Sequence, residues 1–324
     1  AIKSDGGTIS ITNTTLQYNH STNRGGAIIA WNTDLTIQNS NLNDNHGNSD
    51  GGALHIEGSS AASSITLVEK SSFSDNTTSL RAAAIFANSV GNIQINDSTF
   101  KGNQADRWGG AITVNNTGNL GVSNSTFTQN SVTNNQGGAI HANNAGSILT
   151  ITSSTISGNL APGGGDALDL HNFASGSTIT NTILDGELKL NSGNGSNLTI
   201  NHSYLPTLAG GPVNVASANN ITSGTLDLGT LQDNGGPVHT IALGSNSVAI
   251  NTGTGTGTDA RALNSVGTRD IGAFEYQVPR TVYVDSSFTT GGATVDGDLE
   301  WTGTQNATVN TDAFSTIAAA LAAL

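Results

Sequence analysis

The chain has 324 residues with 41 Gly, no Cys, 10% charged residues and a formal net charge of −13. The lack of Cys excludes a disulfide scaffold or a thiolate metal site, and the acidic balance argues against nucleic acid as a partner, since phosphates require clustered Lys and Arg. No apolar run of about 18 residues occurs, so no membrane span is expected. Asn, Ser, Thr and Gly dominate the polar positions, which favours an extracellular or cell-surface location. Because the chain does not open with Met, we expect it to be a piece of a longer protein.

A Gly-Gly-Ala-Ile/Leu motif recurs along the first 170 residues. Clear copies begin at Gly25, Gly51, Gly109 and Gly137, and degenerate copies contain Gly7, Ala83 and Gly165. The second position of the motif falls at 83, 110, 138 and 165, in steps of 27, 28 and 27 residues. A fixed period in the range of roughly 20–50 residues predicts a solenoid built of stacked coils. The residue before each Gly pair varies freely, so only the pair itself is expected to be required.

Within one coil, short apolar segments alternate with polar turns. In the coil that starts at Gly109, we expect a first strand at residues 111–114, a second at residues 120–122 and a third side at residues 127–130. In eight coils, two large apolar residues stand five positions apart. The pairs are Ile11/Leu16, Ile37/Leu42, Val68/Phe73, Ile95/Phe100, Val122/Phe127, Ile151/Ile156, Ile179/Leu184 and Ile200/Leu205. This constant offset predicts that equivalent side chains stack at one corner of successive coils.

An Asn follows the corner residue by three positions in six coils: Asn19, Asn45, Asn76, Asn103, Asn130 and Asn159. Stacked Asn amides can hydrogen-bond to the amides above and below, so we expect a structural ladder. Asn is also a favourable residue for a turn in the left-handed conformation. Both roles are structural, and neither is catalytic.

The combination of Gly-Gly-Ala-Ile with Phe-x-x-Asn resembles the repeats of polymorphic outer-membrane proteins and related autotransporter-like adhesins. The resemblance covers about residues 6–170. It implies a right-handed parallel β-helix of the pectate-lyase type that is displayed outside the cell. We therefore expect an all-β chain in which residues 1–205 form the β-helix repeats.

The period fails after about residue 205, and residues 206–279 carry a different set of segments. These are residues 231–243, Ser247–Asn251, Asp259–Arg261 and Arg269–Glu275. Their order and spacing resemble the choice-of-anchor Q domain, which implies a C-terminal β module for extracellular display or anchoring. The chain departs from that pattern at Asn251, where the family usually has Asp, and at Ala262, where Gly usually follows the Arg.

Residues 280–324 read as a linker, a short strand and an amphipathic helix. Thr311 or Asp312 would cap the helix, and Phe314, Ile317, Leu321 and Leu324 would share one face. With Tyr283, this pattern resembles the N-terminal cap of a pectate-lyase-like β-helix, although it stands at the opposite end of the chain. We expect the segment to cover the first coil of another copy, at Ile2 and Ile9.

The sequence also contains groups that bear on catalysis and metal binding. Asp166, Asp169, His171 and Glu187 could act as acid and base on a polysaccharide, but the Arg and Lys clusters of pectin-active families are missing. His20, His46, His55, His141, His202 and His239 are interpreted as ordinary surface residues. We expect no enzyme activity, no cofactor and no metal site, with calcium at Asp259 and Asp270 as the alternative to an ion-free protein.

The sequence thus predicts a non-enzymatic, extracellular β-helical building block. Copies of the chain would form a surface fibre through head-to-tail contacts, or the chain would be one unit of a giant repetitive adhesin. Host-cell or matrix glycans are possible partners. The alternative is a β-helix that binds or cleaves polysaccharides.

Overall fold

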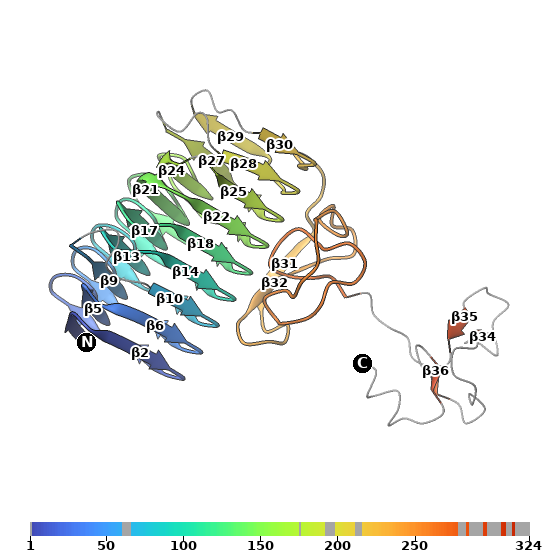
Figure 1. Cartoon of the computed structure of the whole chain (residues 1–324), viewed down its shortest axis with the longest axis horizontal. Coiled ribbons are helices and arrows are strands. Elements are labelled where there is room, and N and C mark those ends of the chain that lie inside the picture. Colours follow the sequence, from blue (N-terminus) through green and yellow to red (C-terminus); the bar gives the residue numbers. More distant parts are fainter. Residues whose placement is uncertain are drawn as a thin grey trace. The chain divides into compact units, whose positions relative to one another are not determined.

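A computed structural model of the chain describes residues 2–59, 66–174, 176–191, 198–210, 216–277, 283–284, 294–296, 306–308 and 313–314. These residues form two compact units, 1–276 and 277–324. The first unit is a parallel β-solenoid followed by an irregular module, as Figure 1 shows. No helix occurs among the described residues, and so none that could cross a membrane.

Four parallel sheets run along the solenoid. Within each sheet, neighbouring strands come from successive coils. Sheet A contains β1 (Ile2–Asp5), β5 (Ile28–Trp31), β9 (Leu54–Glu57), β13 (Ile85–Asn88), β17 (Ile112–Asn115), β21 (Ile140–Ser147), β24 (Leu168–Phe173), β27 (Glu187–Leu190) and β29 (Thr207–Gly210). Sheet B contains β2 (Thr8–Thr12), β6 (Asp34–Gln38), β10 (Thr66–Glu69), β14 (Ile93–Asn96), β18 (Leu120–Ser123), β22 (Leu149–Thr152), β25 (Ser177–Thr180), β28 (Leu198–Asn201) and β30 (Ala216–Ala218).

Two shorter sheets complete the coils. Sheet C contains β3 (Thr15–Gln17), β7 (Asn41–Asn43), β11 (Ser72–Ser74), β15 (Thr99–Lys101), β19 (Thr126–Thr128), β23 (Thr155–Ser157) and β26 (Ile183–Asp185). Sheet D contains β4 (His20–Ser21), β8 (His46–Gly47), β12 (Thr77–Thr78), β16 (Gln104–Ala105) and β20 (Ser131–Val132). The sequence prediction of three sides per coil therefore missed the two-residue strands of sheet D.

The apolar residues stack in the predicted register. Ile95 of sheet B lies between Val68 and Val122, and the same pairing continues from Ile11 to Ile200. At the corner in sheet C, the rings of Phe73 and Phe100 lie 5.0 Å apart and those of Phe100 and Phe127 lie 4.6 Å apart. All three rings are fully buried. The prediction of an all-β parallel solenoid is confirmed.

The six Asn residues after the corner form one hydrogen-bonded column. The Nδ2 of each of the first five donates to Oδ1 of the Asn in the next coil at 2.8–3.0 Å, from Asn19 to Asn159. The same Oδ1 also accepts from the backbone N–H of the preceding Asn, as Asn130 does from Asn103 at 3.1 Å. The inner members are fully buried, so the column satisfies polar groups that water cannot reach.

A second column, of hydroxyl groups, was not predicted. Ser40, Ser71, Ser98, Ser125 and Ser154 are buried at the turn between sheets B and C. Each Oγ donates to the carbonyl two residues earlier and accepts from the backbone N–H of the equivalent residue in the preceding coil, which is Thr14 for Ser40 and a Ser for the others, as Ser98 does from Ser71 at 3.2 Å. These side chains keep the backbone at this turn hydrogen-bonded.

The Gly pair has a steric basis at both positions. Gly51 has a φ of +75°, which L side chains rarely adopt. Gly52 lies so close to the next coil that an added Cβ would stand 2.3 Å from Ala83 O. The pair therefore allows a left-handed corner followed by close contact between coils.

The solenoid continues past the predicted boundary at residue 205, because β29 and β30 extend sheets A and B to Ala218. Residues 219–276 then form the irregular module, with one antiparallel pair, β31 (Leu228–Gln232) and β32 (Thr240–Leu243). The module packs on the solenoid: Thr99 Oγ1 donates to His239 O at 2.7 Å, and Ala273 N donates to Thr155 Oγ1 at 3.0 Å.

In the second unit, four short strands are described. β33 (Tyr283–Val284) pairs in parallel with β36 (Ala313–Phe314), and β34 (Thr294–Asp296) pairs with β35 (Asn306–Thr308) in an antiparallel arrangement. Phe314 was predicted in the first turn of a capping helix but lies in a strand, where backbone pairing with Val284 replaces the helical turn. Ile317, Leu321 and Leu324, the other residues of the predicted helix, lie outside the described residues.

Candidate functional site

One column of side chains points away from the core along sheet A. The strand register aligns Ile29, His55, Phe86, Thr113, His141, Asp169 and Lys189. Their strand neighbours, such as Ile140 and Ala142, lie in the core, and side chains alternate along a strand. Even so, His55, Thr113 and Asp169 are fully buried, so the outer face of the sheet is covered at this column.

The cover comes from the residues that precede the Gly pairs. Asp50 forms an ion pair with Arg81 at 2.7 Å, and the Arg81 guanidinium lies 4.6 Å from the Phe86 ring centroid. The Trp108 ring lies 5.9 Å from the His141 ring. The expectation that this position carries no structural requirement is therefore wrong, because its side chain closes the outward column.

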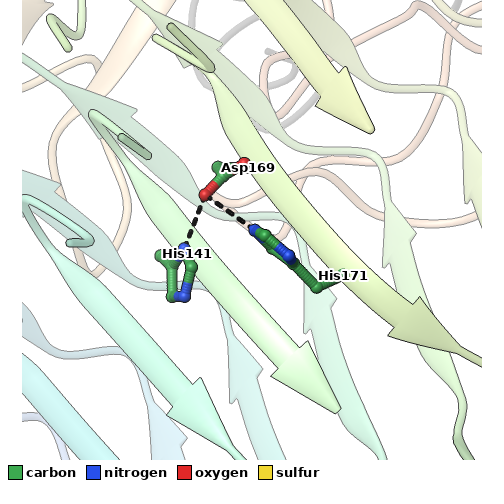
Figure 2. A group of neighbouring side chains, drawn as sticks. All are labelled: His141, Asp169 and His171. Atoms are coloured by element: carbon green, nitrogen blue, oxygen red, sulfur yellow. Dashed lines mark hydrogen bonds and ion pairs between the residues drawn. The ribbon is translucent and has the colours of Figure 1, made fainter. Parts of the chain in front are cut away.

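At the C-terminal end of the covered stretch, His141, Asp169 and His171 form a cluster (Figure 2). His141 Nδ1 lies 2.6 Å from Asp169 Oδ2, and His171 Nε2 lies 3.2 Å from the same oxygen. Their three potential ligand atoms lie within 4.8 Å of one another. The Asp169 side chain is fully buried, whereas the His171 side chain is 25% exposed. The cluster is thus closed on its inner side and open to solvent at His171.

The Asp169 carboxylate is held ionised by its neighbours. Burial alone would raise its pKa, but hydrogen bonds from His141 and His171 lower the pKa to about 2. Asn191 Nδ2 donates to the other oxygen, Oδ1. With its amide oriented so that both ends are bonded, Gln136 donates to Asp169 Oδ2 at 3.2 Å and accepts from Lys189 Nζ at 3.0 Å. The cluster therefore combines one buried carboxylate with two imidazoles and a shell of amides.

The sequence indicated only part of this cluster. Asp169 and His171 were candidate residues, but His141 was interpreted as a surface residue and is 7% exposed. His55 is fully buried as well, stacks on Phe86 and contacts Glu57, so the surface interpretation is wrong for both histidines. Aligning the strands after each Gly pair would have placed His141 beside Asp169.

The other proposed acid and base residues are Asp166, in the loop before β24, and Glu187, at the start of β27. Asp166 Oδ1 accepts from Ala161 N at 2.6 Å, and Glu187 Oε1 accepts from Gly165 N at 2.8 Å. Neither carboxylate is part of the described cluster of His141, Asp169 and His171. Their positions support a role in shaping the corner before β24.

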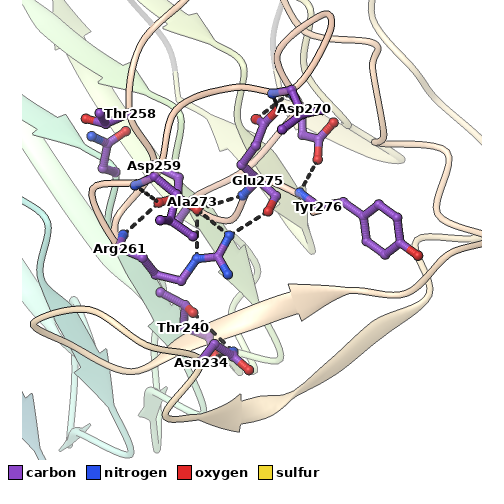
Figure 3. Close-up of polar contacts among 12 residues, drawn as sticks. Asn234, Thr240, Thr258, Asp259, Arg261, Asp270, Ala273, Glu275 and Tyr276 are labelled. Atoms are coloured by element: carbon purple, nitrogen blue, oxygen red, sulfur yellow. Dashed lines mark hydrogen bonds and ion pairs between the residues drawn. The ribbon is translucent and has the colours of Figure 1, made fainter. Parts of the chain in front are cut away.

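The two candidate calcium ligands lie in the polar network of the module (Figure 3). Asp259 Oδ2 accepts from Arg261 Nε at 2.8 Å and from Nη2 at 2.6 Å, and it also accepts from Glu275 N at 3.0 Å. Asp270 accepts from the backbone N–H groups of Asn251 and Tyr276. Burial raises the pKa of Asp270 to about 6. Both carboxylates thus bind groups of the module itself.

The residues expected at the assembly interface lie in both units. At the first described coil, Ile2 is 37% exposed and Ile9 is half-buried against the core. Their strands β1 and β2 each pair on one side only within the described residues. Tyr283 and Phe314 lie in paired strands of the second unit. Ile317, Leu321 and Leu324, the other residues expected at this interface, lie outside the described residues.

Comparison with known families gives one match. Residues 97–115 and 124–143 match the Chlamydia polymorphic membrane protein repeat. These segments run through parts of two consecutive coils, from the turn before β15 to β21. Searches of curated proteins and of solved structures gave no match. The repeat and the solenoid fit an autotransporter-like β-helix with a cell-surface location.

Proposed function

We propose that this chain is a structural, non-enzymatic part of a right-handed β-helix displayed at the cell surface. The observation that carries the proposal is the match of two coils to the polymorphic membrane protein repeat, within a solenoid whose Asn column runs unbroken from Asn19 to Asn159. Parallel strands joined by crossovers are right-handed in nearly all proteins, which supports the proposed hand. Such a column needs no ligand to hold the coils together.

The module of residues 219–276 fits a terminal element of the choice-of-anchor Q type. Two of the segments that carry this resemblance contact each other, because Arg261, which also pairs with Asp259, donates from Nη2 to Glu275 O at 2.5 Å. Ala262, where Gly is usual in that family, has a φ of +66°. A backbone that requires this conformation explains why Gly is preferred there.

We further propose that copies assemble head to tail, with residues 280–324 of one copy covering β1 and β2 of another. Strands with one unpaired edge are templates for strand addition, and the described part of the second unit is made of short strands. The exposed Ile2 and half-buried Ile9 would be covered in such a contact. A contact between different surfaces that does not close into a ring produces an open fibre.

The test compares the full chain with a variant that lacks residues 280–324. We expect the full chain to sediment as a concentration-dependent polymer and to form filaments in electron micrographs, whereas the truncated chain remains a folded monomer. Ile9→Glu should also block assembly, while Tyr18→Glu, at a residue that is 73% exposed, should not. Assembly of the truncated chain would reject the head-to-tail mechanism. Protease digestion of the protein on intact cells tests the surface location separately.

A second candidate function, polysaccharide binding, is favoured by an open pocket beside the first described coils. Trp31, Arg24 and Glu57 line it together with Asp5 and Asn32. Trp31 Nε1 is buried without a partner among the described groups, and an aromatic ring beside charged groups suits a sugar. The test compares the retention of the full chain and of its Trp31→Ala variant on a glycan array. Retention of the full chain alone would support this function, whereas equal retention of both proteins would exclude this pocket as the binding site.

A further inference from the structure

We propose that His141, Asp169 and His171 bind one transition-metal dication of the zinc class and thereby join two neighbouring coils. Two imidazole nitrogens and one carboxylate oxygen form a donor set that binds zinc in preference to calcium or magnesium. Their potential ligand atoms lie within 4.8 Å of one another, so small side-chain rotations bring all three onto one ion. Three protein ligands also leave a fourth position for water.

The backbone preorganises these donors. His141 of β21 and Asp169 of β24 are direct partners in the parallel register, and His171 pairs with Asn143 two residues further along. Because side chains alternate along a strand, Asp169 and His171 project from the same face of β24. The donors therefore come from rigid, hydrogen-bonded strands and do not depend on a loop.

The surroundings match those of a metal ligand. Metal-bound carboxylates are usually held by further hydrogen bonds, and here Asn191 and Gln136 contact Asp169. Lys189, the next residue in the column, donates to Gly163 O at 2.6 Å. Its ammonium group is thereby tied to the loop before β24. Solvent reaches the cluster at His171, which gives an ion a route of entry.

The charge balance favours a cation. Asp169 carries a negative charge at a fully buried position, which is unfavourable unless it is compensated. In the metal-free protein, His141 Nδ1 and His171 Nε2 lie 2.6 and 3.2 Å from this carboxylate, and Asn191 Nδ2 lies 2.9 Å from the same His171 nitrogen. In the metal-bound form, each neutral imidazole carries its single proton on the ring nitrogen that faces away from the ion, and the lone pair of the facing nitrogen binds the ion. The alternative is that the three residues form only a structural ion-pair cluster.

The experiment uses the full chain after treatment with EDTA, titrated with ZnCl₂ in a calorimeter and with CoCl₂ by absorption spectroscopy. We expect one equivalent of zinc to bind and cobalt to give the visible bands of a low-coordinate site. His141→Ala, Asp169→Asn and His171→Gln should each weaken zinc binding by about a hundredfold or more, and Gln136→Ala by roughly tenfold. CaCl₂ should give no heat.

His239→Ala is the matched control, since His239 is exposed and outside the cluster. It should bind zinc as the unchanged chain does. Because Asp169→Asn could unfold the chain, the partly exposed His171→Gln is the deciding variant, with folding checked by circular dichroism. Zinc binding that is equal in His171→Gln and the unchanged chain, or no binding to the unchanged chain at micromolar zinc, would overturn the proposal and leave the ion-pair cluster. Neither outcome bears on assembly.

Discussion

The solenoid and the module bury polar groups by two different means. In the solenoid, neutral side chains such as Asn103 and Ser98 repeat the same bond from coil to coil. In residues 219–276, charged side chains are used once each: Arg261, with a side chain 6% exposed, compensates Asp259 and also lies 3.7 Å from the Phe274 ring centroid. The repeated turns of the solenoid satisfy their buried groups with neutral residues, whereas the irregular loops of the module use unique charged partners.

This difference predicts where a single substitution costs most. A ladder distributes its bonds over many equivalent members, so the loss of one member leaves the others paired. A unique network has no equivalent member to replace the one that is lost. We therefore expect the larger effects in the module, although the solenoid contains most of the buried residues.

The largest effect is expected for Arg261→Ala. The substitution leaves the Asp259 carboxylate buried without its charged partner, which costs about 4 kcal/mol in the free energy of unfolding. Urea unfolding of the full chain, followed by circular dichroism, measures this value. Arg107→Ala, at an Arg whose side chain is 51% exposed, serves as the control and should change the free energy by less than about 0.5 kcal/mol. Equal effects of the two substitutions would show that the network does not stabilise the module.

A smaller loss is expected for Asn103→Ala in the middle of the ladder. The Asn76 amide and backbone N–H both lose their acceptor, and Phe73 O loses a donor, which together cost about 3 kcal/mol. Asn19→Ala removes only bonds at the end of the column and should cost about 1 kcal/mol. Unfolding in urea compares the two. Equal losses would mean that the position in the column is irrelevant.

The pH dependence of stability should reveal Asp270. Burial, together with the nearby Glu275, raises its pKa to about 6 from 3.8, against the opposing effects of Arg269 and the backbone N–H groups of Asn251 and Tyr276. Between pH 4 and 6 the folded state then binds more protons than the unfolded state. The contribution of Asp270 to the free energy of unfolding therefore falls by about 2 kcal/mol as the pH rises through this window.

Asp270→Asn should remove this part of the pH dependence, because the amide does not titrate. Unfolding curves at pH 4.5 and 6.5 for both proteins give the difference. The variant and the unchanged chain are compared because other carboxylates titrate in both proteins, and their effect cancels in the difference. An unchanged difference between the two pH values would assign the dependence to other groups.

The smallest effect has the opposite sign. Ala262 has a φ of +66°, a conformation that costs an L residue about 1 kcal/mol relative to Gly. Ala262→Gly should therefore raise the melting temperature of the full chain in a calorimetric scan. Ala242→Gly, in the strand β32, should lower it. A lower melting temperature for Ala262→Gly would show that chain flexibility outweighs the relief of strain.

The sequence predicted the solenoid because each coil repeats the same contacts. The offset between Val122 and Phe127 fixes two sheets at once, and the Asn positions fix a turn. The β29–β30 coil was missed because it lacks this offset and the motif. Sheet D was missed because two residues per strand carry no periodic signal.

The candidate site was harder to predict, because it depends on residues that break the repeat. The copy at Gly165 contains the additional Asp166, so Asp169 stands one position later after the Gly pair than His141 does after its own. The two residues meet only through the strand register. Gln136 covers them from a position whose identity changes from coil to coil, so no pattern marked it.

The Asn column has a direction. Every described side-chain bond in it runs from Nδ2 of a lower-numbered Asn to Oδ1 of a higher-numbered one, so the amide dipoles are aligned and polarise one another. The solenoid axis is consequently a vector, with acceptor character toward Asn19 and donor character toward Asn159. If two such solenoids met with like ends, their dipoles would oppose each other. Contact between unlike ends is therefore electrostatically favoured.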